Sequence, residues 1–194
     1  MVRPENRTLA IIAAVLIPLL SFGWYVRAQR LEVERQASAA ASRVAGRPVR
    51  VHCPGVLKRT FLQEINHGSV KFYDGRPVDD THLSGEACAG LGRLVSRGAA
   101  LDLTCLQLDQ CSKEDTGVAL GVSVLAHESV HLRGVMDEAQ TECESVRWAA
   151  GVATDLGASP QAAADIADWK FSVGADHLPE QYQTTADCRV APRS

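Results

Sequence analysis

The stretch "AHESVHLRG" at 126–134 contains two histidines four residues apart, with a glutamate directly after the first. Residues four apart lie on one face of a helix, so His127 and His131 can bind the same metal ion. Glu128 projects beside them, where its carboxylate can accept a proton from a metal-bound water. The pattern therefore predicts a site for Zn²⁺ as cofactor. The competing interpretation is an ordinary pair of histidines on a solvated helix.

The H-E-x-x-H pattern resembles the zincin-type zinc metallopeptidases. Glu138, followed four residues later by Glu142, is similar to the arrangement in gluzincins, where the next helix supplies a glutamate ligand. The resemblance implies His127, His131 and Glu138 as zinc ligands. It also implies that Glu142 orients a ligand histidine, a contact that fixes the tautomer of the ring. This resemblance covers residues 113–157.

A second resemblance runs through Asp137, because H-E-x-x-H-x-x-G-x-x-D is similar to the metzincin signature in its aspartate variant. It implies Asp137 as the alternative third ligand. Metzincins also place a methionine turn downstream of the motif, whereas the methionines here are Met1 and Met136.

The zincin resemblance implies hydrolysis of peptide bonds by a zinc-activated water. Glu128 would be the general base, and a peptide or protein would be the substrate. A donor that stabilises the oxyanion is also needed. His177 and Tyr182 are the candidates by residue type and by their downstream position.

Strong boundary signals surround the motif. Ser112 with Asp115 three residues on predicts a helix start, and Gly134 predicts its end. The same reasoning predicts three helices, at about 113–133, 138–156 and 160–171. The first is apolar around most of its circumference, so we expect it to be buried.

The preceding part of the chain predicts a small sheet. Residues 68–77 alternate and contain Asp74-Gly75, which is typical of a hairpin. Residues 85–97 predict a helix, and 99–108 predict a strand whose edge could bind extended peptide. The expected fold is α+β and predominantly helical: a small zincin-like domain with a short sheet packed on the active-site helix, behind one N-terminal transmembrane helix.

Residues 9–26 form an uncharged apolar run of 18 residues, the length of a transmembrane helix. We therefore expect an N-terminal tail and membrane anchor at 1–30, a juxtamembrane stalk at 31–50 and the folded domain at 51–194. The alternative for 1–30 is a signal sequence that is cleaved, leaving a secreted protein.

All six cysteines follow the apolar run. An even number in a domain of this size favours disulfides and an oxidising compartment. We therefore expect a single-pass protein with its C-terminal domain outside the cytoplasm. Cys105 and Cys111 are close enough for a local loop, while the other pairings stay open. No basic stripe with interleaved aromatics is present, so nucleic acid is not an expected partner.

These observations favour a membrane-anchored zinc metallopeptidase. Two alternatives remain at this point. In a non-catalytic zinc-stapled domain, a fourth side chain such as Cys143 or His177 would close the site. A disulfide-held extracytoplasmic interaction domain would bind no metal.

Overall fold

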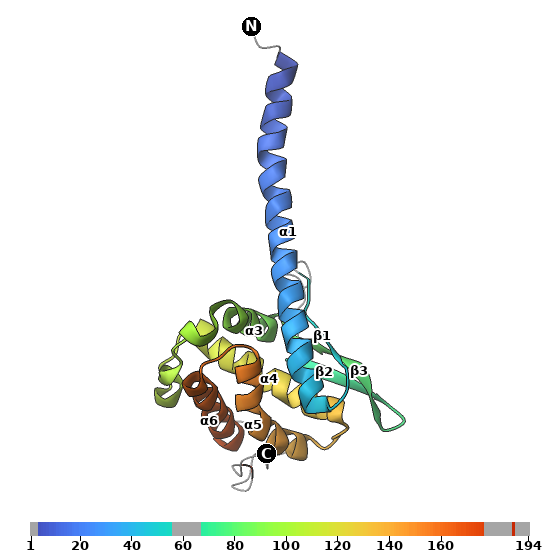
Figure 1. Cartoon of the computed structure of the whole chain (residues 1–194), viewed down its shortest axis with the longest axis vertical. Coiled ribbons are helices and arrows are strands. Elements are labelled where there is room, and N and C mark those ends of the chain that lie inside the picture. The colour runs from blue at the N-terminus through green and yellow to red at the C-terminus, as the bar shows by residue number, and fades with distance from the viewer. Residues whose placement is uncertain (1–3, 56–66, 177–187, 189–194) are drawn as a thin grey trace. The chain divides into compact units, whose positions relative to one another are not determined.

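The computed structural model describes residues 4–55, 67–176 and 188, with only the backbone of 4–13, 15, 19 and 173–176. Helices predominate beside one small sheet (Figure 1). In chain order the elements are α1 (Pro4–Ala45), β1 (Arg50–His52), β2 (Gly68–Tyr73), β3 (Arg76–Leu83), α3 (Gly85–Arg97), the 3-10 helices η1 (Gly98–Ala100) and η2 (Thr104–Leu108), α4 (Lys113–Arg133), α5 (Glu138–Asp155) and α6 (Pro160–Asp176). An α+β, predominantly helical fold is therefore confirmed.

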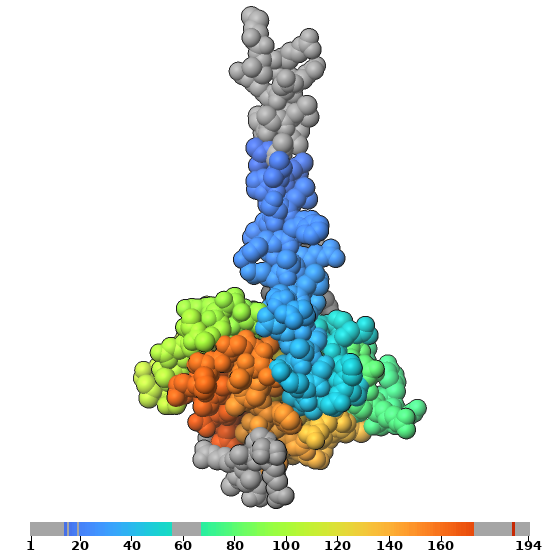
Figure 2. Space-filling model, viewed as in Figure 1, coloured from blue at the N-terminus to red at the C-terminus, as the bar shows by residue number. Residues whose placement is uncertain are grey.

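The C-terminal part of α1 belongs to the folded core. The chain divides into two compact units, 1–32 and 33–194. In the second unit α1 buries an apolar stripe of Val33, Ala37, Ala40, Ala41 and Val44. Arg43 forms an ion pair with Asp155 of α5, and Figure 2 shows this light-blue part of α1 directly against the orange residues. The predicted stalk at 31–50 is therefore wrong, because one face of this part of α1 is buried in the folded domain. The alanines in its sequence allow close packing of that helix face.

Polar side chains of the same helix cover the outer edge of β1. Alternate backbone N–H groups donate to them: Cys53 to Glu34 (2.9 Å), Val51 to Ser38 (2.9 Å) and Val49 to Ser42 (3.0 Å). Three acceptors four residues apart on a helix thus match three donors two residues apart on a strand. This edge of the sheet is closed by side chains instead of by another strand.

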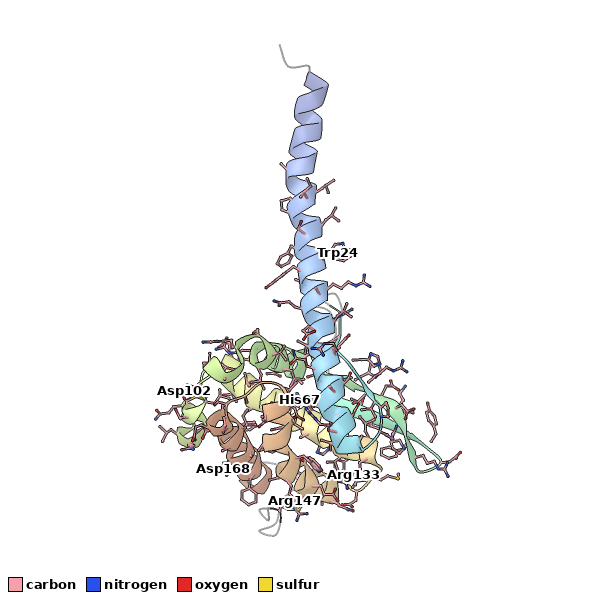
Figure 3. The ribbon with its side chains drawn as sticks, viewed as in Figure 1. Trp24, His67, Asp102, Arg133, Arg147 and Asp168 are labelled. Carbon is pink, nitrogen blue, oxygen red and sulfur yellow. A yellow bond between two sulfur atoms is a disulfide. The ribbon has the colours of Figure 1, made fainter. Side chains whose placement is uncertain are left out.

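The described residues of the first unit, 4–32, form the N-terminal part of α1. Its large apolar side chains that the structure describes are exposed, including Leu16 and Phe22. Trp24, labelled in Figure 3, is exposed as well. Within the described part of the chain, no helix combines the length and the apolar character needed to cross a membrane. The predicted span, 9–26, includes side chains that lie outside the described residues, and the anchor stays a prediction.

The sheet has the strand order β1-β3-β2 and packs on α4. Strand β3 pairs in parallel with β1 and antiparallel with β2. The predicted hairpin is confirmed, because Asp74 and Gly75 both have positive φ (50° and 73°), as a tight two-residue turn requires. Arg47 joins sheet and helix by donating to the carbonyls of Val78 (3.1 Å) and Leu132 (3.0 Å).

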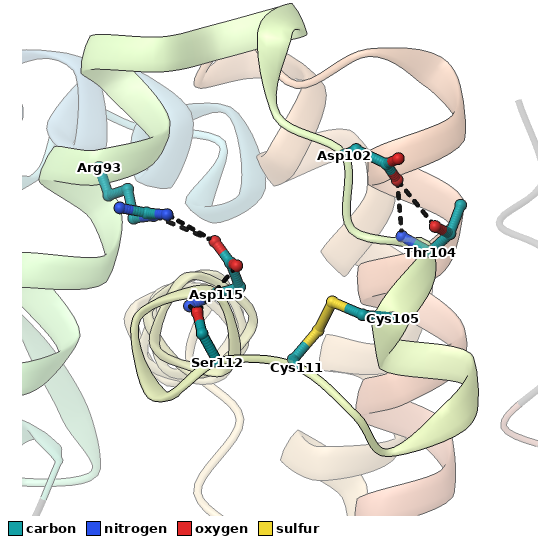
Figure 4. Close-up of a disulfide and its surroundings, with 7 residues drawn as sticks. All are labelled: Arg93, Asp102, Thr104, Cys105, Cys111, Ser112 and Asp115. Atoms are coloured by element: carbon teal, nitrogen blue, oxygen red, sulfur yellow. Dashed lines mark hydrogen bonds and ion pairs between the residues drawn. A yellow bond between two sulfur atoms is a disulfide. The ribbon is translucent and has the colours of Figure 1, made fainter.

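Helix α4 contacts α3, α5, α6, β2 and β3. It begins as predicted, since the Ser112 hydroxyl accepts from the Asp115 N–H (3.1 Å). The Asp115 carboxylate accepts from Arg93 of α3 (2.8 Å; Figure 4). Gly134 ends the helix with φ 111°, and its N–H donates to the His131 carbonyl. The helix is thereby fixed at both ends.

Two glycine contacts bring α3 and α4 close together. A methyl group at Gly90 would overlap the Gly117 carbonyl, and one at Gly121 would lie 2.6 Å from the Ala87 carbonyl oxygen. Because neither position has room for a side chain, α4 sits deep in the core against α3.

The predicted strand at 99–108 is wrong, because the segment forms η1 and η2. The Asp102 carboxylate accepts from the Thr104 N–H (3.0 Å) and hydroxyl (2.8 Å), which turns the backbone. The Cys105–Cys111 disulfide then closes a short loop (Figure 4). The expected peptide-binding edge in this segment is therefore absent.

Helices α5 and α6 begin where predicted. The Asp137 carboxylate accepts from the Gln140 N–H (2.8 Å), and the Ser159 hydroxyl accepts from the Ala162 N–H (3.1 Å). Helix α6 continues to Asp176, beyond the predicted end. All six cysteines are paired, which confirms the disulfides: Cys53–Cys88, Cys105–Cys111 and Cys143–Cys188.

Candidate metal centre

One turn of α4 brings His127 and His131 together. Their Nε2 atoms are 3.1 Å apart, and the rings meet edge to face with centroids 4.8 Å apart. The side chains are only 15% and 8% exposed. Polar rings in such a setting require partners, because an unpaired buried polar group is unfavourable.

Glu138 completes a triangle with the two rings. The turn at Gly134 lets α5 begin at Glu138, whose Oε2 lies 3.1 Å from His127 Nε2 and 3.3 Å from His131 Nε2. In a tetrahedral zinc site, metal–ligand distances of about 2.0–2.1 Å separate the ligand atoms by about 3.3–3.4 Å. The three atoms therefore fit one zinc ion, and they form the one such group in the part of the chain that the structure describes.

The far side of each ring fixes its tautomer. His131 Nδ1 is 2.7 Å from the Val135 carbonyl oxygen, which can only accept, so Nδ1 carries a proton. His127 Nδ1 is 2.8 Å from Glu142 Oε2 and donates to it in the same way. In the neutral rings both Nε2 lone pairs consequently face Glu138 Oε2 and each other. Three converging lone pairs repel unless a cation lies between them.

Glu142 is held on its other side by Lys170 of α6. Lys170 Nζ donates to Glu142 Oε1 (2.7 Å), and the two side chains are 4% and 6% exposed. Burial alone would raise the pKa of Glu142. The Lys170 charge and the hydrogen bonds from His127 and Lys170 outweigh burial and lower the pKa to about 2. Glu142 is therefore an ionised acceptor.

Glu128 lies on α4 directly after His127 and is buried. Burial raises its pKa to about 7; the positive charge that His127 carries when it is protonated opposes this shift, and the charge of Glu138 adds to it. Its Oε2 has no hydrogen-bond partner among the described residues. A buried carboxylate of this kind, beside a metal-ligand triangle, has the properties of a proton acceptor.

The edge strand β2 runs past this site. At its start, Gly68 is so close to Glu128 that a methyl group there would lie 2.6 Å from Oε1. Further along, the Phe72 ring packs edge-on against His131, with centroids 6.0 Å apart. Strand β2 thus confines both the acid and one of the histidines.

The other predicted residues lie elsewhere. Asp137 is exposed and caps α5, so it is not part of the triangle. Cys143 is bonded to Cys188 and has no thiolate to offer a metal. His177 and Tyr182, the expected oxyanion donors, lie outside the described residues.

Sequence reasoning missed Lys170 and Gly68. Lys170 follows the buried Ile166 by one helical turn, so its position on the inner face of α6 was a signal for a buried charge. Gly68 carries no comparable signal. A side chain at this position would collide with Glu128, which lies 60 residues later in the chain.

Comparison with known proteins gives no relative for this chain. No protein-family model, curated protein or solved structure matches it.

Proposed function

We propose that the protein is a zinc-dependent peptidase whose metal is bound by His127, His131 and Glu138. The observation that carries this proposal is the triangle of ligand atoms, 3.1–3.3 Å apart. Both Nδ1 atoms are engaged by acceptors, so the lone pairs converge on one point. Glu128, beside the triangle, supplies the general base that a water-activating site needs.

Glu128 and Glu142 have different roles in the proposed hydrolysis of peptide bonds. When bound, zinc supplies a Lewis acid that lowers the pKa of a coordinated water to about 7 and polarises a carbonyl oxygen. Glu128 accepts a proton from the attacking water and delivers it to the leaving amine. Glu142 keeps the His127 ring in the tautomer that offers Nε2 to the metal. The donor for the oxyanion stays unassigned.

The ligand set favours a catalytic over a structural zinc. Structural sites close the fourth position with a protein side chain, whereas catalytic sites have three protein ligands. Cys143, the nearest cysteine in sequence to Glu138, is committed to a disulfide. The described residues therefore supply a three-ligand set, which leaves the fourth position for water.

We further propose that the enzyme acts outside the cytoplasm. Its three disulfides support an oxidising compartment. The apolar run at 9–26 supports a membrane anchor, with a cleaved signal sequence as the alternative.

The test is hydrolysis of a quenched fluorescent peptide library by the full chain and by Glu128→Gln. The variant should bind zinc like the wild type and lose about 10²–10⁴-fold in rate. Glu144→Gln, a change on the neighbouring helix, is the matched control and should stay active. A Glu128→Gln enzyme as active as the wild type, or wild-type hydrolysis that a zinc chelator leaves unchanged, would contradict the proposal.

A further inference from the structure

A chain of three side chains crosses the helices behind the metal centre. His127 on α4 contacts Glu142 on α5 (2.8 Å), and Glu142 contacts Lys170 on α6 (2.7 Å). Each oxygen of Glu142 has its own partner, Oε2 with His127 and Oε1 with Lys170. The sequence pattern H-E-x-x-H contains no hint of this third residue.

The buried ion pair needs an explanation other than stability. Replacing a buried pair by apolar side chains of similar volume is often neutral or stabilising, so folding alone gives little reason for Lys170. Helix α6 also turns Ala162, Ala163 and Ile166 into the core. The other buried charged residue among its described side chains, Asp165, accepts from Gln107 and Gln161 and lies apart from Glu142 in its contacts. An ammonium group on that face therefore indicates a role for its contact with Glu142.

Two carboxylates one helical turn apart, Glu138 and Glu142, both approach His127. Only Glu138 reaches the Nε2 side, where the metal would lie. We propose that Lys170 is a positioning residue that holds Glu142 on His127 Nδ1, so that Glu138 alone serves as the carboxylate ligand. This inference rests on the metal site proposed above, and Lys170 acts through Glu142 without touching the metal or the substrate.

A positioning role and a purely electrostatic role of Lys170 predict opposite changes in zinc affinity when Lys170 is removed. If Lys170 contributed only its positive charge, its removal would strengthen zinc binding. If it positions Glu142, its removal loosens the His127 ring and weakens zinc binding, by about 10- to 100-fold for contacts of this kind.

The experiment compares zinc affinity in the full-length wild type and Lys170→Met by competition with a chromophoric chelator. Arg93→Met is the matched control, because it likewise removes an interhelical ion pair, here to Asp115 at the end of α4 away from the histidines. We expect weaker binding in Lys170→Met and wild-type binding in Arg93→Met. Unchanged or tighter binding in Lys170→Met overturns the proposal.

A double-mutant cycle tests whether Lys170 acts through Glu142. In a Glu142→Gln background, Lys170→Met should weaken zinc binding no further, since the carboxylate to be positioned is gone. A further loss of similar size would overturn the proposal. If Lys170→Met is too unstable to fold, Lys170→Gln replaces it, with a smaller loss expected in the same direction.

Histidine ¹⁵N NMR on the metal-free proteins separates this inference from the proposed function. The wild type should show His127 protonated at Nδ1, and Lys170→Met should show a mixture of tautomers. If the wild type takes up no zinc, the proposed metal site is wrong. A change of the His127 tautomer in Lys170→Met would still support the positioning role. Identical spectra for the two proteins overturn that role.

Discussion

Two regions of the molecule bring a pair of histidines and an acid together. The buried group, His127, His131 and Glu138, lies between α4 and α5. The sheet group, His52, His82 and Asp80, lies on β1 and β3, where the two histidines are register partners. Their ring centroids are 4.8 and 5.0 Å apart, so the separation of the rings hardly distinguishes the groups.

The contacts behind the rings distinguish them. In the buried group each Nδ1 has an acceptor at 2.7–2.8 Å, and both Nε2 atoms converge with the acid. In the sheet group Asp80 is 3.8 Å from His82 Nδ1, and these side chains are 35% and 61% exposed. The His82 ring is thus open to water, which competes with Asp80 for its nitrogen atoms. Two histidines and an acid close to one another are thus insufficient for a metal site. Other side chains must also orient the ligand lone pairs toward one point.

The largest expected effect comes from deleting one histidine of each group. His131→Ala removes a ligand, and the zinc affinity of the protein should fall by at least about 100-fold. His82→Ala should leave it unchanged. Chelator competition on both variants measures the difference, and an equal loss in the two would erase the distinction between the groups.

Glu142, the carboxylate behind the buried group, and Asp80 of the sheet group should contribute differently to the stability of the protein at low pH. The pKa of Glu142 is about 2 in the folded protein against an ordinary 4.5, so the folded state holds this carboxylate ionised. The resulting stability, about 3 kcal/mol, is fully present above pH 4.5 and is lost as the pH falls towards 2. In metal-free protein, denaturant unfolding should show a large gap between wild type and Glu142→Gln at pH 6 that closes near pH 2.

Asp80→Asn is the control for that titration. Asp80 is partly exposed and only loosely placed near His82, so its removal should change the free energy of unfolding by less than about 1 kcal/mol at pH 6. If Asp80→Asn altered the pH dependence of the unfolding free energy as much as Glu142→Gln does, the buried contacts of Glu142 would not be the cause of that dependence.

The smallest effect concerns the space around the buried group. Gly68→Ala places a methyl group against the Glu128 carboxylate and should lower peptide hydrolysis by about 10- to 100-fold with zinc retained. Gly151→Ala, on α5 where a methyl group meets nothing within 4 Å, should keep full activity and stabilise the helix by about 0.5–1 kcal/mol. Equal activities of the two variants would show that Gly68 does not confine Glu128.

The parts that the sequence predicted are local. Ser112, Gly134 and Asp137 fix the helix ends from within a few residues, because caps satisfy the backbone groups next to them. The distance between His127 and His131 follows from the helical repeat alone. The hairpin at Asp74-Gly75 is equally local, since the turn itself requires positive φ.

The parts that it missed depend on distant partners. Lys170 is 28 residues from Glu142. The serines at 38 and 42 look like linker residues until the edge of β1 lies beside them. The leucines of 99–108 alternate like those of a strand, yet the Asp102 turn and the Cys105–Cys111 disulfide decide the backbone. In each case tertiary contacts override the local pattern.

The central claim is that the buried group binds one zinc ion with three protein ligands. Elemental analysis of the full chain, purified without added metal, tests it most directly when combined with zinc X-ray absorption spectroscopy. The account predicts about one zinc per chain, with two imidazole nitrogens and a carboxylate oxygen at about 2.0–2.2 Å and no sulfur. A folded protein that contains no zinc and takes none up, or a zinc closed by a fourth side chain, would contradict it.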